Sequence, residues 1–153
     1  IKRLGCAKAI DYRADDIAES FDRSLINGVD LYFDNVGGET LNACLDHLNL
    51  GGRIVLCGSI SEYTQADNYA LPNYTRLRRV DGQMRGFFVY NHLNDWDRAM
   101  AEMASWIKEG RLSPVEQVTD GFVHMPSALA GLYDGANFGK QLCRVRGEPD
   151  EWA

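Results

Sequence analysis

The stretch VDLYFDNVGG, residues 29–38, decides the fold. Residues 29–33 have the composition of a β-strand, and the glycine pair at the end of the stretch predicts a turn into a helix. After that helix comes the apolar run Ile54-Val55-Leu56-Cys57. An unbroken run of this kind is typical of a strand in a parallel sheet that is covered on both faces. The order strand, helix, strand therefore predicts an α/β fold, a Rossmann-like parallel sheet flanked by helices.

The alternation of strands and helices continues on both sides of this stretch. Apolar spacing, capping residues and glycine or proline breaks set the expected bounds. The pair Gly51-Gly52 is expected to stop the helix that follows residue 38, so that Leu48 belongs to the apolar face of that helix. The other expected elements are strands at 7–12, 53–57, 83–90, 115–123 and 141–145, helices at 16–27, 74–80, 95–108 and 126–133, and a polar loop at 59–73.

The pattern changes after Pro114, where the remaining sequence reads as a separate structural unit. We therefore divide the chain into two parts, residues 1–111 and residues 112–153. The last residues, 147–153, are expected to form a loose tail.

Charge and hydropathy argue against two classes of partner. The net charge is −6, and no basic run is longer than the one formed by Arg76, Arg78 and Arg79. A nucleic-acid-binding domain needs a larger basic surface than this. No apolar run approaches the roughly 20 residues that a membrane-spanning helix requires. We expect neither nucleic acid nor a membrane as a partner.

The four cysteines, Cys6, Cys44, Cys57 and Cys143, form no C-x-x-C pair, and the three histidines are scattered. A zinc site needs clustered Cys and His ligands, so we expect no structural or catalytic metal. The cysteines are expected to be small buried thiols in a reducing compartment, which predicts a cytoplasmic location.

Two loops follow apolar strands and contain glycines, the loop at 34–38 and the loop at 57–63. In open parallel sheets, ligands bind beyond the carboxyl ends of the strands, and glycines let a ligand approach the backbone. Glycines after strands also serve simply as turns, and the residues alone leave both interpretations open. The patterns G-x-G-x-x-G, G-x-x-x-x-G-K-[ST] and G-x-S-x-G do not occur.

Several segments, taken in order, resemble the medium-chain dehydrogenases and reductases. The resemblance is to the zinc-independent branch of leukotriene B4 dehydrogenases, prostaglandin reductases and alkenal or curcumin reductases. Each segment is a weak signal alone, but together they run in the order of the family over nearly the whole chain. The segments are residues 5–12, 29–38, 52–58, 84–87 and 137–140.

The resemblance implies an NADPH-dependent enzyme that reduces the C=C bond of α,β-unsaturated ketones or aldehydes. Hydride would pass to the β-carbon, and a hydrogen-bond donor would stabilise the negative charge on the carbonyl oxygen. By resemblance this catalytic donor is Tyr63, because a tyrosine hydroxyl is protonated at neutral pH. The residues that the resemblance places at the cofactor are Tyr12, Asn35, Cys57, Gly58, Ser59, Ile60, Phe87, Phe88, Val89 and Asn137.

The resemblance also implies that the fold is truncated at its N-terminal half. Residues 1–111 would be a partial dinucleotide-binding domain, and residues 112–153 would return to a catalytic domain that is absent. The strand at 7–12 would lack the two strands that separate it from the strand at 29–33. It must then pair directly with 29–33, pair with another chain or be displaced. Residues 1–153 alone are expected to be inactive.

Two other functions and one assembly are also considered. The alternatives to an enone reductase are a quinone reductase of the same superfamily and a non-catalytic module for nucleotide binding or protein interaction. The strand near 84–90 is expected to be the open edge of the sheet, with no proline or lysine to prevent pairing. We therefore expect a homodimer in which two copies of this strand run antiparallel.

Overall fold

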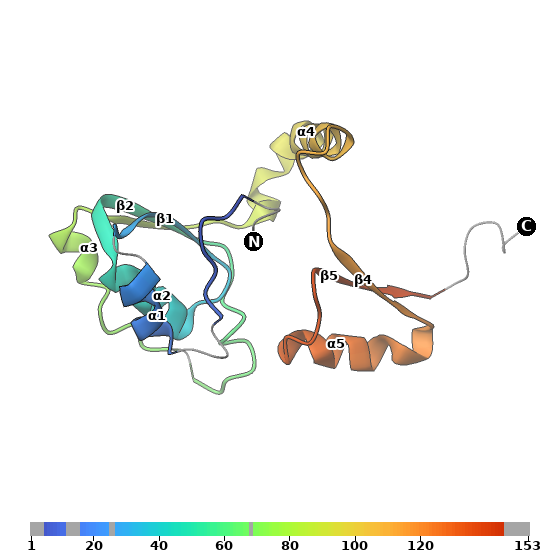
Figure 1. Cartoon of the computed structure of the whole chain (residues 1–153), viewed down its shortest axis with the longest axis horizontal. Helices are drawn as coiled ribbons and strands as arrows, with labels where there is room; N and C mark the ends of the chain where they lie inside the picture. The colour runs from blue at the N-terminus through green and yellow to red at the C-terminus, as the bar shows by residue number, and fades with distance from the viewer. Residues whose placement is uncertain (1–4, 12–15, 25–26, 68, 146–153) are drawn as a thin grey trace, which may run out of the picture. The chain divides into compact units, whose positions relative to one another are not determined.

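The computed structural model describes residues 5–11, 16–24, 27–67 and 69–145 (Figure 1). The chain divides into two compact units, Ile1–Val89 and Tyr90–Ala153. The sequence-based division at residue 111 separates a cofactor domain from a C-terminal segment. This functional division stays a prediction, because two compact units do not show which residues bind a cofactor. None of the helices in the described ranges is long and apolar enough to cross a membrane.

The first unit is built on a parallel sheet with the strand order β1-β2-β3. Helices α1 and α2 lie together on one side of this sheet (Figure 1). This arrangement confirms the predicted α/β fold with a parallel sheet. The elements in chain order are α1 (Ile17–Ser24), β1 (Val29–Asp34), α2 (Gly38–Asp46), β2 (Leu48–Leu56), α3 (Arg76–Arg79) and β3 (Gln83–Gly86).

The core of this unit lies between α2 and the sheet. Leu41 and Leu45 of α2 pack against Leu48 and Ile54 of β2, and all four side chains are buried. Side chains alternate between the two faces of a strand, so the helix-covered face of β1 carries Tyr32 and Asp34. The opposite face leaves Leu31 and Phe33 exposed, at 62% and 52%. Within the described part of the first unit, helices therefore cover one face of the sheet.

A second cluster joins α1 to α2 through Phe21, Ala43 and Cys44. Burial, with a smaller contribution from the Asp34 carboxylate, raises the pKa of the Cys44 thiol to about 12. The prediction of four buried thiols is wrong, because Cys6 and Cys57 are exposed and Cys143 is half-buried. Of the four cysteines, only Cys44, which lies in the cluster between α1 and α2, is buried.

Helix α2 ends earlier than the glycine pair predicts. His47 caps it, with its N–H directed to the carbonyls of Cys44 and Leu45, and Val29 N–H donates to the His47 carbonyl at 2.8 Å. The chain then enters β2 at Leu48, so Leu48 belongs to the strand and not to the helix. Gly51-Gly52 lies inside β2, where the pairing with β1 shifts between Val29 and Leu31. The glycines therefore accommodate a strand irregularity.

Two predicted strands are wrong in part. Residues 7–11 form no strand, so this segment does not pair with residues 29–33, and Tyr12 lies outside the described residues. Of the three expected outcomes, displacement and pairing with another chain remain. Strand β3 ends at Gly86, although it was expected to continue to residue 90. Its last partner, Leu56, is also the last residue of β2, so the ladder has no strand on which to continue.

The second unit contains a long helix and a small parallel pair of strands, β4 with β5. The predicted elements are confirmed, although β4 is shorter than expected and β5 begins one residue earlier. Asp95 precedes α4 without a side-chain capping hydrogen bond. The tail at 147–153 lies outside the described residues. The elements are η2 (Val89–Asp95), α4 (Trp96–Lys108), β4 (Glu116–Asp120), η3 (Phe122–His124), α5 (Met125–Tyr133) and β5 (Lys140–Arg144).

We predict that Leu45→Ala destabilises the protein far more than Leu50→Ala. Leu45 is fully buried, whereas Leu50 is 79% exposed. The same change of side chain should lower the free energy of unfolding by about 2–5 kcal/mol at the buried position and by less than about 0.5 kcal/mol at the exposed one. Urea denaturation measures both losses, and equal losses would contradict the assigned core.

Candidate functional site

The site begins with a turn that Asp34 organises at the end of β1. Its Oδ1 atom accepts hydrogen bonds from the Tyr32 hydroxyl at 2.7 Å and from the N–H groups of Val36 and Gly37, both at 2.9 Å. Asp34 is fully buried. Burial of Tyr32 and then its hydrogen bond to Asp34 raise the pKa of Tyr32 above its usual range. The tyrosine therefore remains a proton donor to the carboxylate, and the turn is held from inside the protein.

The loop after β2 is hydrogen-bonded to this turn along its length. The carbonyl of Asp34 accepts from the N–H groups of Cys57 at 2.8 Å and Gly58 at 3.0 Å. Further along, the carbonyl of Asn35 accepts from Ile60 N–H at 3.2 Å. These bonds bring the 34–38 and 57–63 loops side by side at the carboxyl ends of β1 and β2. The two loops predicted from the sequence thus form one site.

Tyr63 folds back over its own loop. Its hydroxyl oxygen accepts a hydrogen bond from Ser59 N–H at 3.3 Å, while 61% of the residue is exposed. Gly58 lies directly beneath, because a Cβ atom there would be 3.2 Å from the Tyr63 hydroxyl and 3.4 Å from the Asn35 carbonyl oxygen. Asn35, Gly58, Ser59 and Tyr63 therefore lie together, and their surface is open to a ligand.

Phe87, Phe88 and Val89 follow β3 next to the same ends of the sheet. Phe87 N–H donates to the Leu56 carbonyl at 2.8 Å, and the rings of Phe87 and Phe33 lie 6.2 Å apart. Phe88 and Val89 are exposed, at 59% and 41%. Because these residues do not continue the strand, most of their backbone groups lie outside the sheet ladder.

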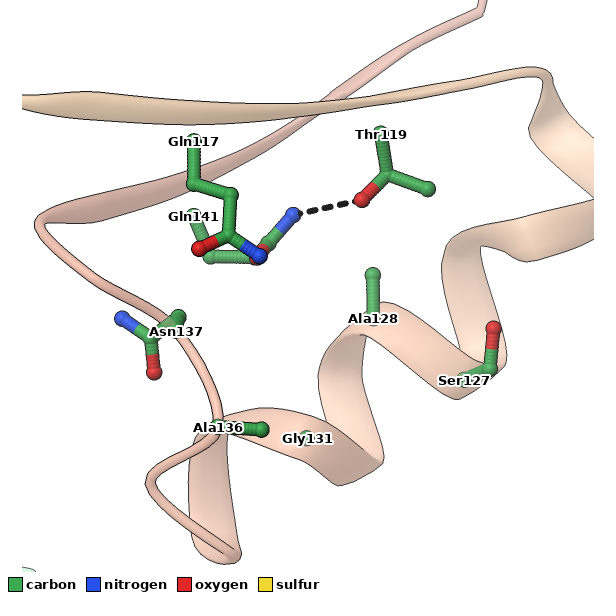
Figure 2. A pocket seen from close by; sticks show the side chains of 8 residues that line it. All are labelled: Gln117, Thr119, Ser127, Ala128, Gly131, Ala136, Asn137 and Gln141. Carbon is green, nitrogen blue, oxygen red and sulfur yellow. Dashed lines mark hydrogen bonds between the residues drawn. The ribbon is translucent and has the colours of Figure 1, made fainter.

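Two other residues implied by the resemblance do not belong to the described part of the first unit. Tyr12 lies outside the described residues. Asn137 belongs to the second unit, where it lines a cavity of about 210 Å³ between β4, β5 and α5 (Figure 2). One hydrogen bond joins two polar side chains of the lining, because Gln141 Nε2 donates to Thr119 Oγ1 at 2.9 Å, as Figure 2 shows. Asn137 itself donates to the Gly139 carbonyl at 2.7 Å.

Sequence reasoning missed three side chains that build the site, Asp34, Ser61 and Glu62. Ser61 Oγ donates to the Val36 carbonyl at 2.6 Å, and Glu62 Oε1 accepts from Gly38 N–H at 3.2 Å. One signal was available for Glu62. Gly37 precedes a helix and has no side chain to cap it, so an acceptor must come from elsewhere.

We predict that Gly37→Ala disrupts the contact between the two loops. Gly37 has φ 72° and ψ −159°, a region that is nearly exclusive to glycine. An added Cβ would lie 2.5 Å from Glu62 Oε1 and 2.9 Å from Ser59 Cβ. The free energy of unfolding should fall by about 3 kcal/mol or more, as measured by urea denaturation.

The control for this substitution is Gly51→Ala. Gly51 also has a positive φ, 71°, but its added Cβ would meet nothing within 4 Å. The expected loss there is about 1–2 kcal/mol, the cost of the backbone conformation alone. Losses of the same size at Gly37 and Gly51 would show that the loops do not depend on their close approach.

Comparison with known families matches residues 4–142 to the zinc-binding dehydrogenase family. In the described part of the chain, no group of three or more His, Cys, Asp and Glu side chains is placed to hold a metal ion. These residues therefore do not fit a zinc site. That the reaction uses no metal stays a prediction.

Individual relatives agree with the family match. The chain is 34% identical over 156 residues to the NADPH-dependent curcumin reductase of Escherichia coli, covering 95% of the chain and 44% of that protein. It is 34% identical over 147 residues to the NADP(+)-dependent 2-alkenal reductase of Nicotiana tabacum, covering 95% of the chain and 43% of that protein. The chain thus spans less than half the length of these relatives.

A solved structure is similar over the same part. The crystal structure of CurA from Vibrio vulnificus in complex with NADPH matches with a TM-score of 0.85 and 32% identity, covering 94% of this chain and 44% of that one. The matched residues, 4–142, are most of the chain. The chain belongs to the zinc-binding dehydrogenase family.

Proposed function

We propose that this chain is the C-terminal part of an NADPH-dependent reductase that acts on the C=C bond of α,β-unsaturated ketones or aldehydes. The observation that carries the proposal is the pair of loops joined at the carboxyl ends of β1 and β2, with the Tyr63 hydroxyl beside Ser59. The names of the relatives support the same class of reaction and the same cofactor. The similarity to a structure solved with NADPH supports a cofactor site in this fold.

The joined loops suit the nicotinamide end of the cofactor. Asn35, Cys57 and Ile60 are exposed on the joined loops, and Gly58 places no side chain between Asn35 and Tyr63. We propose that these residues, with Ser59 and the backbone of Phe87, Phe88 and Val89, hold that end, and that Tyr12 and Asn137 also contact the cofactor. When bound, NADPH supplies the hydride that reduces the C=C bond.

Tyr63 is the proposed donor to the substrate carbonyl oxygen. Its hydroxyl oxygen already accepts from Ser59 N–H, which fixes the oxygen and leaves the hydroxyl proton to be donated. Charge develops on the carbonyl oxygen as the C=C bond is reduced, and a donor directed at it lowers the barrier. Neither a metal nor a covalent intermediate is needed in this scheme.

We predict that the whole protein that contains this chain reduces enones with NADPH and that Tyr63→Phe slows the reaction. The substitution removes one donor and leaves the cofactor loops in place. The value of kcat/KM should fall by up to roughly 10²-fold, with the affinity for NADPH nearly unchanged. Absorbance of NADPH during turnover and a cofactor titration measure the two quantities.

The matched control is Tyr74→Phe, because Tyr74 is exposed to the same extent as Tyr63, at 60% and 61%. It should leave kcat/KM unchanged. An equal effect of the two substitutions would remove Tyr63 from the mechanism. Residues 1–153 alone should not turn over, since they contain no glycine-rich turn for the pyrophosphate. A protein that reduces only quinones, or that binds no nicotinamide cofactor, would favour one of the alternative functions.

The protein is also proposed to form a homodimer through the edge of its sheet and to reside in the cytoplasm. β3 is an edge strand of the described sheet, and residues 83–90 include neither lysine nor proline. Next to this edge, Phe88 and Tyr90 are exposed, at 59% and 65%. An edge strand with these features is a template for pairing with a second copy.

We predict that light scattering finds a dimer at tens of micromolar and that Phe88→Lys dissociates it. A lysine next to β3 would bring two like charges together across a two-fold axis. Phe138→Lys is the control, because Phe138 is also exposed, at 79%, but lies in the second unit. A monomeric wild-type protein, or equal dissociation by both substitutions, would contradict pairing through β3.

A further inference from the structure

Helix α2 begins without a capping side chain of its own. Its N-cap is Gly37, and the first N–H groups of a helix need acceptors from outside the helix. Glu62 supplies one, because its Oε1 atom accepts from Gly38 N–H at 3.2 Å. The two residues are 24 positions apart in the chain. A carboxylate at this end also interacts favourably with the positive end of the helix dipole.

The second oxygen of the same carboxylate holds a third segment. Glu62 Oε2 accepts from Tyr69 N–H at 3.3 Å, and Glu62 is half-buried between these partners. One side chain therefore joins the start of α2, the 57–63 loop and the segment at residue 69. Hydrogen bonds to a charged acceptor are stronger than those between neutral groups.

The contact is close enough to set the conformation of the loop. The added Cβ that would lie 2.5 Å from Glu62 Oε1 shows that the carboxylate lies directly against the backbone of Gly37. On one side of Glu62, Ser61 donates to the Val36 carbonyl. On the other side is Tyr63, the proposed donor. The contacts of the Glu62 carboxylate with α2 and residue 69 therefore restrict the backbone that carries Tyr63.

We propose that Glu62 is a positioning residue, which anchors the 57–63 loop to the start of α2 and so holds Tyr63 in place for reduction of the substrate. The proposal rests on the proposed function. Glu62 does not contact the reacting atoms. Its two carboxylate oxygens act on the reaction through the backbone of the loop.

The test compares Glu62→Ala with Glu62→Gln in the whole reductase, with NADPH and an enone as substrates. Glu62→Ala removes both acceptors, and kcat/KM should fall about tenfold. Glu62→Gln keeps one oxygen acceptor and should recover part of the loss. It also serves as the milder variant if the alanine protein does not fold. Glu39→Gln is the control, because it removes a carboxylate from the exposed first turn of the same helix.

A double-mutant cycle separates positioning from a general loss of structure. If Glu62 acts through Tyr63, then Glu62→Ala should cost less than about twofold in a protein that already carries Tyr63→Phe. Equal losses with and without the Tyr63 hydroxyl would overturn the proposal. So would a loss for Glu39→Gln as large as that for Glu62→Ala, since helix charge alone would then explain the effect.

Amide hydrogen exchange gives a readout that does not depend on turnover. Exchange at Gly38 and Tyr69 should become faster in Glu62→Ala and stay unchanged in Glu39→Gln. Unchanged exchange in Glu62→Ala would overturn the anchor even in an active enzyme. A wild-type protein that reduces no enone would instead reject the proposed function, and with it the role of Glu62 in that reaction.

Discussion

The buried carboxylate of Asp34 joins the sheet to both loops of the site. Its Oδ1 atom accepts three hydrogen bonds, and its carbonyl accepts from Cys57 and Gly58 across the strand ends. These hydrogen bonds to Oδ1 offset part of the cost of burying the carboxylate, whose Oδ2 atom is buried without a hydrogen-bond partner. The end of β1, the turn and the start of the next loop therefore share one arrangement. The other parts of the site are built on this junction.

From Asp34 outward, each contact places the next group nearer to the surface. The turn fixes Gly37, the missing side chain of Gly37 admits Glu62, and Glu62 precedes Tyr63. The Tyr63 hydroxyl, which lies on an exposed loop, is thus positioned through a series of contacts that begins at the buried carboxylate of Asp34. The joined loops are held mainly by backbone hydrogen bonds and one anchoring side chain, and Asn35, Cys57 and Ile60 stay exposed on them.

The sequence predicted the parts that depend on local pattern. The strand at β1, the glycine turn and the apolar run of β2 follow from period and residue type, and both loops were expected at the carboxyl ends of parallel strands, where ligands bind. The end of α2 was wrong, since the glycine pair lies in β2 and His47 ends the helix. Residues 7–11 and 87–90 lack the strand partners that their composition favours. Glu62 was missed because its contact crosses 24 residues, which local pattern does not reveal.

The chain spans less than half the length of its relatives. Leu31 and Phe33 are exposed on one face of its sheet, whereas parallel sheets are ordinarily covered on both faces. A crystal structure of the whole protein with NADPH tests most directly the proposal that the joined loops are a cofactor site. We predict that the nicotinamide end lies against Asn35 and the 57–63 loop, with the Tyr63 hydroxyl facing the substrate. A cofactor bound away from both loops would contradict the claim.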